Sequence, residues 1–247
     1  MSSGAGVDTA KYAAAKRAVD ENVTDGMLLG VGTGSTAKHI VKILAEKISK
    51  GDLSSIICVA TSADTRLSLL NESQPQLVVS ELDRHFQLDL CIDGADEIDS
   101  YLNCIKGGGA CLTQEKLVMR CAKRFLLVAD ASKKSERLGL KFSRLPLEVL
   151  PVAHRPVKRW IEEEHGGECV LRFAQRKAGP VITDNGNYIL DWTFPQGCLA
   201  ADAPTLQLLN QRLKLLSGVV ETGLFLGAAE KAYFGKEDGS VEVLVAK

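Results

Sequence analysis

The sequence lacks the features that mark a membrane-spanning, secreted or metal-binding protein. No apolar run approaches the roughly 18–20 residues that are needed to cross a bilayer. The first residues contain no hydrophobic segment of the kind that a secretory signal carries. The four histidines show no spacing typical of metal ligands. We therefore expect a cytoplasmic chain with no membrane partner, no metal and no cofactor.

The cysteines lack the pattern of a disulfide framework. Seven are present, which is an odd number, and no two of them have CxxC spacing. Most lie inside apolar runs, so we expect buried, reduced thiols in a compartment such as the cytosol. Cys111 is the exception, because it lies in a glycine-rich stretch.

The sequence also lacks an excess of charge of either sign. Its 30 Lys and Arg residues and 31 Asp and Glu residues give a formal net charge of −1, so neither nucleic acid nor an anionic membrane is an implied partner. Local basic clusters can still bind small anions. The length of 247 residues suits one large α/β domain, or a main domain with a smaller companion.

Apolar runs that suit buried strands alternate with helical patterns through the first half of the chain. This alternation predicts a mostly parallel sheet with helices on both faces. We expect Asp8 or Thr9 to cap the first helix. The expected strands are residues 27–31, 56–60, 77–79, 88–92 and 125–128. Two helices are expected at residues 9–23 and 64–71. Two more are expected to begin after glycine loops: one follows the 32–36 loop and ends at about residue 50, and the other follows the 107–109 loop and ends at about residue 123.

The pattern changes after about residue 135, where strands and helices follow in the order typical of a small α+β domain. We expect a main α/β domain at residues 1–135 and 217–247 and a small inserted α+β domain at residues 136–216. A strong turn signal, Asp184-Asn185-Gly186-Asn187, lies inside one expected strand. In this small domain the expected strands are residues 147–152, 170–174 and 182–192, and the expected helices are residues 156–164 and 204–216. Two further strands, at residues 219–225 and 241–245, are expected to return to the main domain.

Three polar motifs follow expected strands, and ligands of open α/β sheets bind beyond the carboxyl ends of the strands. We therefore expect the three motifs to meet at one edge of the sheet. The first motif is Gly30-Val31-Gly32-Thr33-Gly34-Ser35-Thr36. Glycines let the backbone approach an anion, the helix N-terminus offers amides, and the Ser and Thr side chains add hydroxyls.

This first motif is not a nucleotide-binding loop. The lysine of GxxxxGK[ST] is missing, and the third glycine comes one residue too early for GxGxxG. A cradle for the phosphate of a small molecule fits better, with Thr33, Gly34, Ser35 and Thr36 as its residues. The alternative is a tight strand-to-helix turn with a serine as the N-cap.

The second motif, Asp93-Gly94-Ala95-Asp96-Glu97-Ile98-Asp99, places four acids within seven residues at the end of an expected strand. Such a cluster is costly unless it is solvated or used. We expect Asp93 and Asp96 to bind sugar hydroxyls and to assist proton movements. A metal site and an acidic solvated turn are the alternatives, and the solvated turn suits Asp99 best.

The third motif runs from Lys106 through three glycines, Gly107, Gly108 and Gly109, into a helix that contains Glu115. The glycines expose backbone donors, and Lys106 can place a cation beside developing negative charge. A carboxylate such as Glu115, partly removed from water, can act as a general base. Taken alone, Glu115 fits a surface position on the helix better than a catalytic one, and the surrounding motif reverses that balance.

Together these motifs closely resemble those of the type A ribose-5-phosphate isomerases. The resemblance rests on GVGTGST, DGADEID, KGGGACLTQEK and ADASK at 129–133, with TDNGN and GLF at 223–225 in addition. It covers nearly the whole chain. It implies a Rossmann-like main domain, a smaller α+β domain and a homodimer or homotetramer. It also implies the interconversion of D-ribose 5-phosphate and D-ribulose 5-phosphate in the non-oxidative pentose phosphate pathway.

By the same resemblance, Glu115 matches the proton acceptor of an enediolate mechanism, and Asp93, Asp96 and Lys106 are the other candidate catalytic residues. Lys11 is the nearest candidate for an N-terminal lysine that contacts phosphate. The Thr61–Thr65 stretch fits the position of a serine- and threonine-rich loop. The implied substrate-binding residues are Thr33, Gly34, Ser35, Thr36, Asp93, Gly94, Ala95, Asp96, Lys106, Gly107, Gly108, Gly109 and Lys133.

Three other functions compete with an isomerase. A sugar-phosphate deaminase and a CoA-transferase-like enzyme are enzymes on a related fold. A non-catalytic sugar-phosphate sensor belongs to a different class, but the sequence shows neither a DNA-binding segment nor a basic domain.

Overall fold

The computed structural model describes residues 4–72 and 77–246. Its contacts divide the chain into two compact units. The first unit runs to Ala95 and also contains Gln114–Lys134 and the residues from Ala228 onward, and the second contains Asp96–Thr113 and Ser135–Gly227. This division differs from the expected domain boundaries, because strands that lie outside 136–216 pair inside the second unit.

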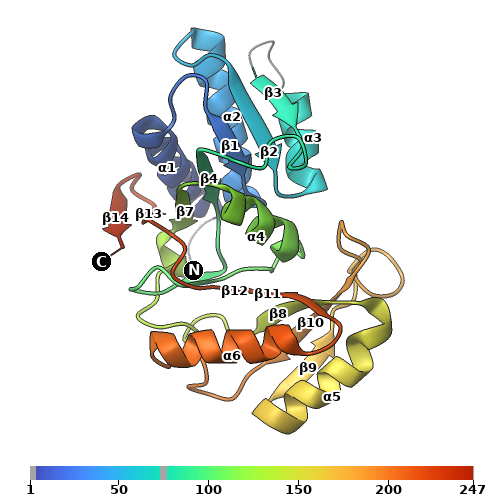
Figure 1. The fold of residues 1–247 in the computed structure, drawn as a ribbon. Helices are drawn as coiled ribbons and strands as arrows, with labels where there is room; N and C mark the ends of the chain where they lie inside the picture. The colour runs from blue at the N-terminus through green and yellow to red at the C-terminus, as the bar shows by residue number, and fades with distance from the viewer. Residues whose placement is uncertain (1–3, 73–76, 247) are drawn as a thin grey trace. The chain divides into compact units, whose positions relative to one another are not determined.

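The first unit is built on a seven-stranded sheet with the order β14-β13-β7-β4-β1-β2-β3 (Figure 1). Neighbouring strands are parallel except for the antiparallel pair β13–β14. The mostly parallel sheet is thus confirmed, although the sequence pattern did not predict β13. The strands are β1 (Leu28–Val31), β2 (Ile56–Ala60), β3 (Leu77–Ser80), β4 (Leu90–Asp93), β7 (Phe125–Asp130), β13 (Lys231–Gly235) and β14 (Val241–Val245).

Helices cover both faces of this sheet, as expected. Residues of α1 and α2 share one buried apolar cluster with residues of β1, β2, β4 and β7. The opposite face carries α4. Gly30 of β1 points to that face, since its neighbours Leu29 and Val31 belong to the cluster with α1 and α2, and Val118 of α4 packs against it: a Cβ atom on Gly30 would lie 2.6 Å from Cγ1 of Val118. The helical elements are α1 (Gly4–Asn22), α2 (Ser35–Lys50), α3 (Ala63–Asn71), α4 (Leu112–Cys121) and the short 3₁₀ helix η1 (Ala131–Lys133).

The first helix begins earlier than the sequence pattern suggested, so the prediction that Asp8 or Thr9 caps it is wrong. Both residues lie inside α1. The hydroxyl of Thr9 donates to the carbonyl of Ala5 at 3.0 Å, and the Asp8 carboxylate lies 3.0 Å from Nε2 of His39. Asp and Thr are common helix N-caps, but they also occur inside helices, so their presence in the sequence does not by itself fix where a helix begins.

The second unit contains a four-stranded antiparallel sheet with the order β11-β8-β10-β9. Alternate residues of β8 and β10 form one apolar cluster with α5 and α6, so both helices pack on the same face (Figure 1, yellow and orange). The elements are β8 (Leu145–Val149), β9 (Glu168–Leu171), β10 (Tyr188–Thr193), β11 (Val219–Thr222), α5 (His154–His165), α6 (Ala203–Leu215) and the 3₁₀ helix η2 (Pro151–Ala153).

A second sheet of this unit has the order β12-β6-β5, from β5 (Glu97–Ile98), β6 (Cys104–Ile105) and β12 (Leu224–Phe225). The expectation that residues 219–225 return to the main domain is therefore wrong, because β11 pairs with β8 and β12 pairs with β6. The expectation for 241–245 is confirmed, since β14 pairs with β13 in the first unit.

The predicted turn at 184–187 forms just before β10, so the expected strand at 182–192 begins only at Tyr188. The fully buried carboxylate of Glu148 holds this turn. Its Oε1 accepts from Oγ1 of Thr183 at 2.8 Å and from Nδ2 of Asn187 at 2.9 Å. These bonds turn the backbone away from the sheet ladder, which explains why the strand is shorter than expected.

Candidate active site

In the first unit, the loop after β1 lies against the last residue of β4. The amide of Gly32 donates to the carbonyl of Ile92 at 2.9 Å, and the amide of Thr33 donates to Oδ1 of Asp93 at 3.0 Å. A Cβ atom on Gly32 would lie 1.9 Å from this Oδ1, so only glycine allows the close approach. The first two sequence motifs thus meet at the carboxyl ends of neighbouring parallel strands.

The start of α2 gathers groups that suit an anion. The N-cap is Gly34, with φ of 99° and no side-chain cap bond, so the alternative of an N-cap serine is wrong. Ser35 is instead the first helical residue, and its Oγ accepts from Nζ of Lys11 at 3.1 Å. A lysine, hydroxyls and the amides of a helix N-terminus therefore lie together. Ser35 is exposed, whereas Thr36 is buried.

Residues after β2 support the loop after β1. The hydroxyl of Thr33 lies 2.7 Å from the hydroxyl of Thr61, and the hydroxyl of Thr65 donates to the carbonyl of Gly32 at 2.8 Å. Ser62 caps α3 by accepting from the amide of Thr65 at 3.1 Å. The sequence placed Thr61 in a serine- and threonine-rich loop but did not include it among the substrate-binding residues. Its position after the strand next to β1 is the signal that would have found it.

Asp93 is almost fully buried, with 1% of its surface exposed. Its Oδ1 accepts a second hydrogen bond, of 2.7 Å, from the amide of Gly94. Two main-chain donors on one oxygen give the carboxylate a single orientation at the end of β4. Gly94 and Ala95, which follow, are partly buried.

Glu115 lies in the first turn of α4 and is 5% exposed. The alternative that it is a surface residue is therefore wrong. The N-terminal end of a helix favours a carboxylate, and a charged side chain is rarely buried unless it is paired or used. Lys133 ends η1, which follows β7 at the same edge of the sheet as the ends of β1 and β4, and is partly buried.

In the second unit, Asp96 holds the glycine loop at Gly107–Gly109. Its Oδ2 accepts from the amide of Gly108 at 2.8 Å. Its own amide donates to the carbonyl of Ile105 at 2.8 Å, so the β5–β6 pair places both ends of the interaction. A Cβ atom on Gly108 would lie 2.6 Å from Oδ1 of Asp96. Gly107 is buried, whereas Gly108 and Gly109 are exposed.

Lys106 directly follows β6 and is 3% exposed. Its amide donates to the carbonyl of Gly223 at 2.9 Å, and its Nζ lies 5.6 Å from the ring centroid of Phe225. A Cβ atom on Gly223 would lie 2.4 Å from the carbonyl oxygen of Lys106. The GLF stretch therefore serves to position Lys106, through close backbone approach and a cation–π contact.

The remaining acids of the second motif have structural roles. The carboxylate of Glu97, with no exposed surface, accepts from the amides of Gly139, Leu140 and Lys141. Asp99 is 3% exposed and accepts from the amides of Tyr101 and Asn103. Burial raises the pKa of the Asp99 carboxyl, against the lowering effect of these donors. The interpretation of Asp99 as part of a solvated turn is therefore wrong.

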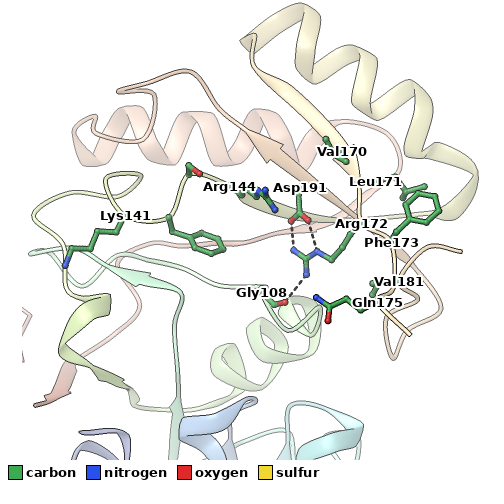
Figure 2. A pocket seen from close by; sticks show the side chains of 12 residues that line it. Gly108, Lys141, Arg144, Val170, Leu171, Arg172, Phe173, Gln175, Val181 and Asp191 are labelled. Carbon is green, nitrogen blue, oxygen red and sulfur yellow. Dashed lines mark hydrogen bonds and ion pairs between the residues drawn. The ribbon is translucent and has the colours of Figure 1, made fainter. Parts of the chain in front are cut away.

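A pocket of about 840 Å³ opens in the second unit beside the glycine loop. Figure 2 shows the guanidinium of Arg172 between the carboxylate of Asp191 and the carbonyl of Gly108. Lys141 and Arg144 also line the pocket, so its lining carries more positive than negative charge. Neither Arg172 nor Asp191 was predicted from the sequence, because an isolated arginine and an isolated aspartate on different strands form no motif.

Three further expectations concern metals, cysteines and membrane-spanning helices. Within residues 4–72 and 77–246, no group of three or more His, Cys, Asp or Glu side chains is arranged to hold a metal ion. The thiol of Cys111, partly buried in the glycine-rich stretch, donates to the carbonyl of Gly109 at 3.3 Å. In the same described ranges, no helix is both long enough and apolar enough to cross a membrane.

The predicted site residues thus form two groups, one in each unit. The first unit brings Thr33–Thr36 to Asp93 and places Glu115 in the first turn of α4. The second unit brings Asp96 to the loop that follows Lys106. Lys11, which the sequence suggested only as the nearest candidate, does reach the first group through Ser35.

Comparisons with known proteins agree on one family. Residues 57–239 match the model of ribose 5-phosphate isomerase A (phosphoriboisomerase A). A probable ribose 5-phosphate isomerase of Caenorhabditis elegans is 46% identical over 239 residues, which cover 97% of this chain and 93% of the relative. The ribose-5-phosphate isomerase of Homo sapiens is 45% identical over 237 residues, which cover 96% of this chain and 73% of the relative.

Solved structures give the same result. A D-ribose-5-phosphate isomerase in complex with phospho-erythronic acid has a TM-score of 0.88 and 35% identity, covering 97% of this chain and 99% of the other. Ribose 5-phosphate isomerase A of Methanocaldococcus jannaschii has a TM-score of 0.84 and 38% identity, covering 95% of this chain and 97% of the other. With this fold, these motifs and this coverage, the chain belongs to the ribose 5-phosphate isomerase A family.

Proposed function

We propose that the chain interconverts D-ribose 5-phosphate and D-ribulose 5-phosphate as an aldose–ketose isomerase of the non-oxidative pentose phosphate pathway. The observation that carries this proposal is the likeness to ribose-5-phosphate isomerases over 97% of the chain. The phospho-erythronic acid in the complex of one solved relative is a phosphorylated sugar acid, which fits a sugar phosphate as the substrate.

In the proposed mechanism Glu115 is the general base. The C2–H of the open-chain aldose is acidic because it lies beside the C1 carbonyl. Glu115 takes this proton, the electron pair forms the C1–C2 double bond of an enediolate, and the carbonyl pair moves to O1. The proton then returns to C1, while the hydroxyl proton of O2 passes to O1. Its place in the first turn of a helix and its burial support this role.

The phosphate of the substrate is assigned to the Thr33–Thr36 loop. The amides at the start of α2 and the hydroxyls of the loop are donors that suit a phosphate. Lys11, bonded to Ser35, and Lys133, at the end of η1, supply positive charge in the first unit. A phosphate held at this loop orients the reacting carbons at the other end of the sugar.

The remaining residues are assigned to the sugar and to the developing charge. Asp93 and Asp96 bind hydroxyls of the sugar and assist the opening of the furanose ring, with Gly94 and Ala95 between them in the chain. Lys106 and the amides of the Gly107–Gly109 loop stabilise the enediolate, because preorganised donors at a developing oxyanion are usually the largest catalytic contribution. The fixed orientation of Asp93 and the bond from Asp96 to Gly108 support these roles.

We also infer a homodimer or homotetramer and a cytoplasmic location. The odd number of cysteines and the lack of CxxC spacing fit a reducing compartment. Sedimentation equilibrium of the purified chain measures the oligomeric state directly, and a monomer at micromolar concentration would contradict the inference.

The proposed function is tested by adding ribose 5-phosphate to the chain in D₂O and following the products by NMR. We expect ribulose 5-phosphate to form, with deuterium entering at C1 to the extent that the base exchanges its proton with solvent. Absence of ketose would contradict the proposal. Glucosamine 6-phosphate with an ammonia assay, and CoA with a thioester assay, then decide between a deaminase and a CoA transferase.

A further inference from the structure

Arg172 and Asp191 form a two-point ion pair in the second unit (Figure 2). Nε of Arg172 donates to Oδ2 of Asp191 at 2.7 Å, and Nη2 donates to Oδ1. The two side chains are 17% and 12% exposed. Asp191 lies on β10 between Leu190 and Trp192, which belong to the core cluster with α5 and α6. The Asp191 side chain therefore projects from the opposite face of the sheet.

The same guanidinium binds the glycine loop. Nη1 of Arg172 donates to the carbonyl of Gly107 at 2.8 Å and to the carbonyl of Gly108 at 3.1 Å. The backbone of Arg172 is itself held, because its amide donates to Ile189 at 2.9 Å and its carbonyl accepts from Val181 at 2.8 Å. Arg172 therefore links a rigid sheet to two successive peptide groups of the loop.

This contact sets the direction of the loop amides. In a trans peptide the C=O and the N–H point in opposite directions. With the carbonyls of Gly107 and Gly108 turned toward Arg172, the amides of Gly108 and Gly109 point away from it. The amide of Gly108 indeed donates to Asp96 at 2.8 Å. Arg172 thus holds the loop through its carbonyls and Asp96 holds it through an amide, while the amide of Ala110 closes a turn by donating to the carbonyl of Gly107 at 3.0 Å.

Three consecutive glycines have little conformational preference of their own, so some other group has to restrict them. A buried ion pair is a weak source of net stability, because the desolvation of both charges offsets their attraction. The planar guanidinium fork, in contrast, is well suited to fixing directions in space. The geometry therefore fits an orienting role better than a purely stabilising one.

We propose that Arg172, held by Asp191, is a positioning residue that keeps the amides of the Gly107–Gly109 loop in the orientation needed for catalysis. This proposal rests on the proposed function, in which the loop amides stabilise the enediolate. Because the amide of Gly108 is bonded to Asp96, the amide of Gly109 is the one that Arg172 orients for the developing charge. Arg172 acts through the loop and not by contact with the substrate. Loss of the two carbonyl contacts should therefore impair the chemical step more than the binding of substrate.

The test uses four variants of the full chain: Arg172→Gln, Arg172→Lys, Asp191→Asn and the Arg172→Gln/Asp191→Asn double variant. Arg159→Gln is the matched control, because Arg159 donates from Nε to Glu163 at 2.7 Å in an exposed pair on α5 of the same unit. For Arg172→Gln we expect kcat to fall about 10²-fold, the scale of a misplaced catalytic group. We expect KM to change by less than about threefold, since uniform binding is retained.

The other variants separate geometry from charge. Arg172→Lys keeps the charge but not the fork, so it should recover only part of the lost kcat. The double variant should be no slower than Arg172→Gln, because Asp191 acts through Arg172. Affinity for 4-phospho-D-erythronate, a stable acid that resembles the enediolate, should fall along with kcat. Arg159→Gln should match the unmodified chain in every assay.

Amide hydrogen exchange provides a readout that needs no substrate. In Arg172→Gln, exchange should become faster in the peptide that contains Gly107–Gly109 and remain unchanged in α5. If the unmodified chain does not isomerise ribose 5-phosphate, the proposed function fails and the exchange experiment still tests the loop. A normal kcat in folded Arg172→Gln, or faster exchange spread evenly over the second unit, would overturn the positioning role.

Discussion

The Oδ1 atom of Asp93 occupies the space in which a side chain on Gly32 would have to begin, 1.9 Å from the position of a Cβ atom. The amide of the next residue, Thr33, donates to the same oxygen at 3.0 Å. A glycine of the first motif and an acid of the second motif are therefore held together by packing, and the next residue of the first motif adds a hydrogen bond.

Substitution Gly32→Ala should therefore damage the site. The new methyl group has to push away either the Asp93 carboxylate or the loop, and we expect activity to fall about 10²-fold or more. Overpacking should also lower the free energy of unfolding by about 1–3 kcal/mol. Steady-state kinetics and urea unfolding measure both effects. Gly4→Ala is the control, because no atom of residues 4–72 and 77–246 lies within 4 Å of a Cβ atom there; equal activity of the two variants would contradict the prediction.

Glu115→Gln should abolish the base while preserving the shape of the side chain. We expect turnover to fall about 10²–10⁴-fold, the usual contribution of general acid–base catalysis, with little change in the affinity for 4-phospho-D-erythronate. Glu46→Gln on the exposed side of α2 is the control and should be fully active. Near-normal turnover of Glu115→Gln would exclude this residue as the base.

Treatment with EDTA followed by dialysis should leave the activity unchanged, because the proposed proton transfer uses only side chains and backbone donors. The measurement is the initial rate with ribose 5-phosphate before and after treatment. A loss that added divalent cations restore would favour a metal site in the acidic loop instead.

Asp89 should make the stability of the first unit depend on pH. Its Oδ2 accepts from the amide of Leu28 at the start of β1, at 3.0 Å, and its Oδ1 accepts from Lys123 at 2.9 Å. The Leu28 amide, followed by Lys123, lowers the pKa of the Asp89 carboxyl in the folded state. Its ionised form therefore contributes stability above the unfolded pKa of about 3.9, and this contribution is lost as the pH falls through the folded pKa.

The variant Asp89→Asn, which resembles the protonated form, should lower the free energy of unfolding at pH 7 by about 1 kcal/mol, the scale of one hydrogen bond. The difference from the unmodified chain should shrink as the pH falls below about 3.9 and disappear once the pH has passed the lower folded pKa, where both chains carry an uncharged group. Urea unfolding across this range measures it. Lys123→Met should change little, because exposed ion pairs contribute about 0–1 kcal/mol. A difference that stays constant with pH would contradict the assignment.

The cysteines should react in two classes with iodoacetamide at pH 8, because the thiolate is the reactive form. Complete burial raises the pKa of Cys58 to about 12, and burial raises the pKa of Cys169 to about 12. Both should resist labelling until the chain unfolds, whereas the partly exposed Cys111 and Cys121 should label. Ribose 5-phosphate should slow the labelling of Cys111 but not that of Cys121. Equal protection, measured by mass spectrometry, would place the substrate away from the glycine loop.

The sequence alone determined the elements whose signals are local. The alternation of apolar runs with helical patterns determined the parallel sheet, and β2 (Ile56–Ala60) matches the prediction residue for residue. The glycine and acid motifs indicated the candidate site, because ligands of open α/β sheets bind beyond the carboxyl ends of the strands, where these motifs lie. Their resemblance to one family gave the function that the comparisons then supported.

Only the tertiary structure decided which strands pair and which polar residues serve the site. It assigned β11 and β12 to the second unit, and it showed that the buried acids Glu97 and Asp99 hold backbone amides of that unit. It also joined Arg172 to Asp191, which is 19 residues away in the chain, and to the glycine loop, which is about 65 residues away. Strand pairing and side-chain contacts depend on partners that are distant in sequence, and local periodicity carries no information about such partners.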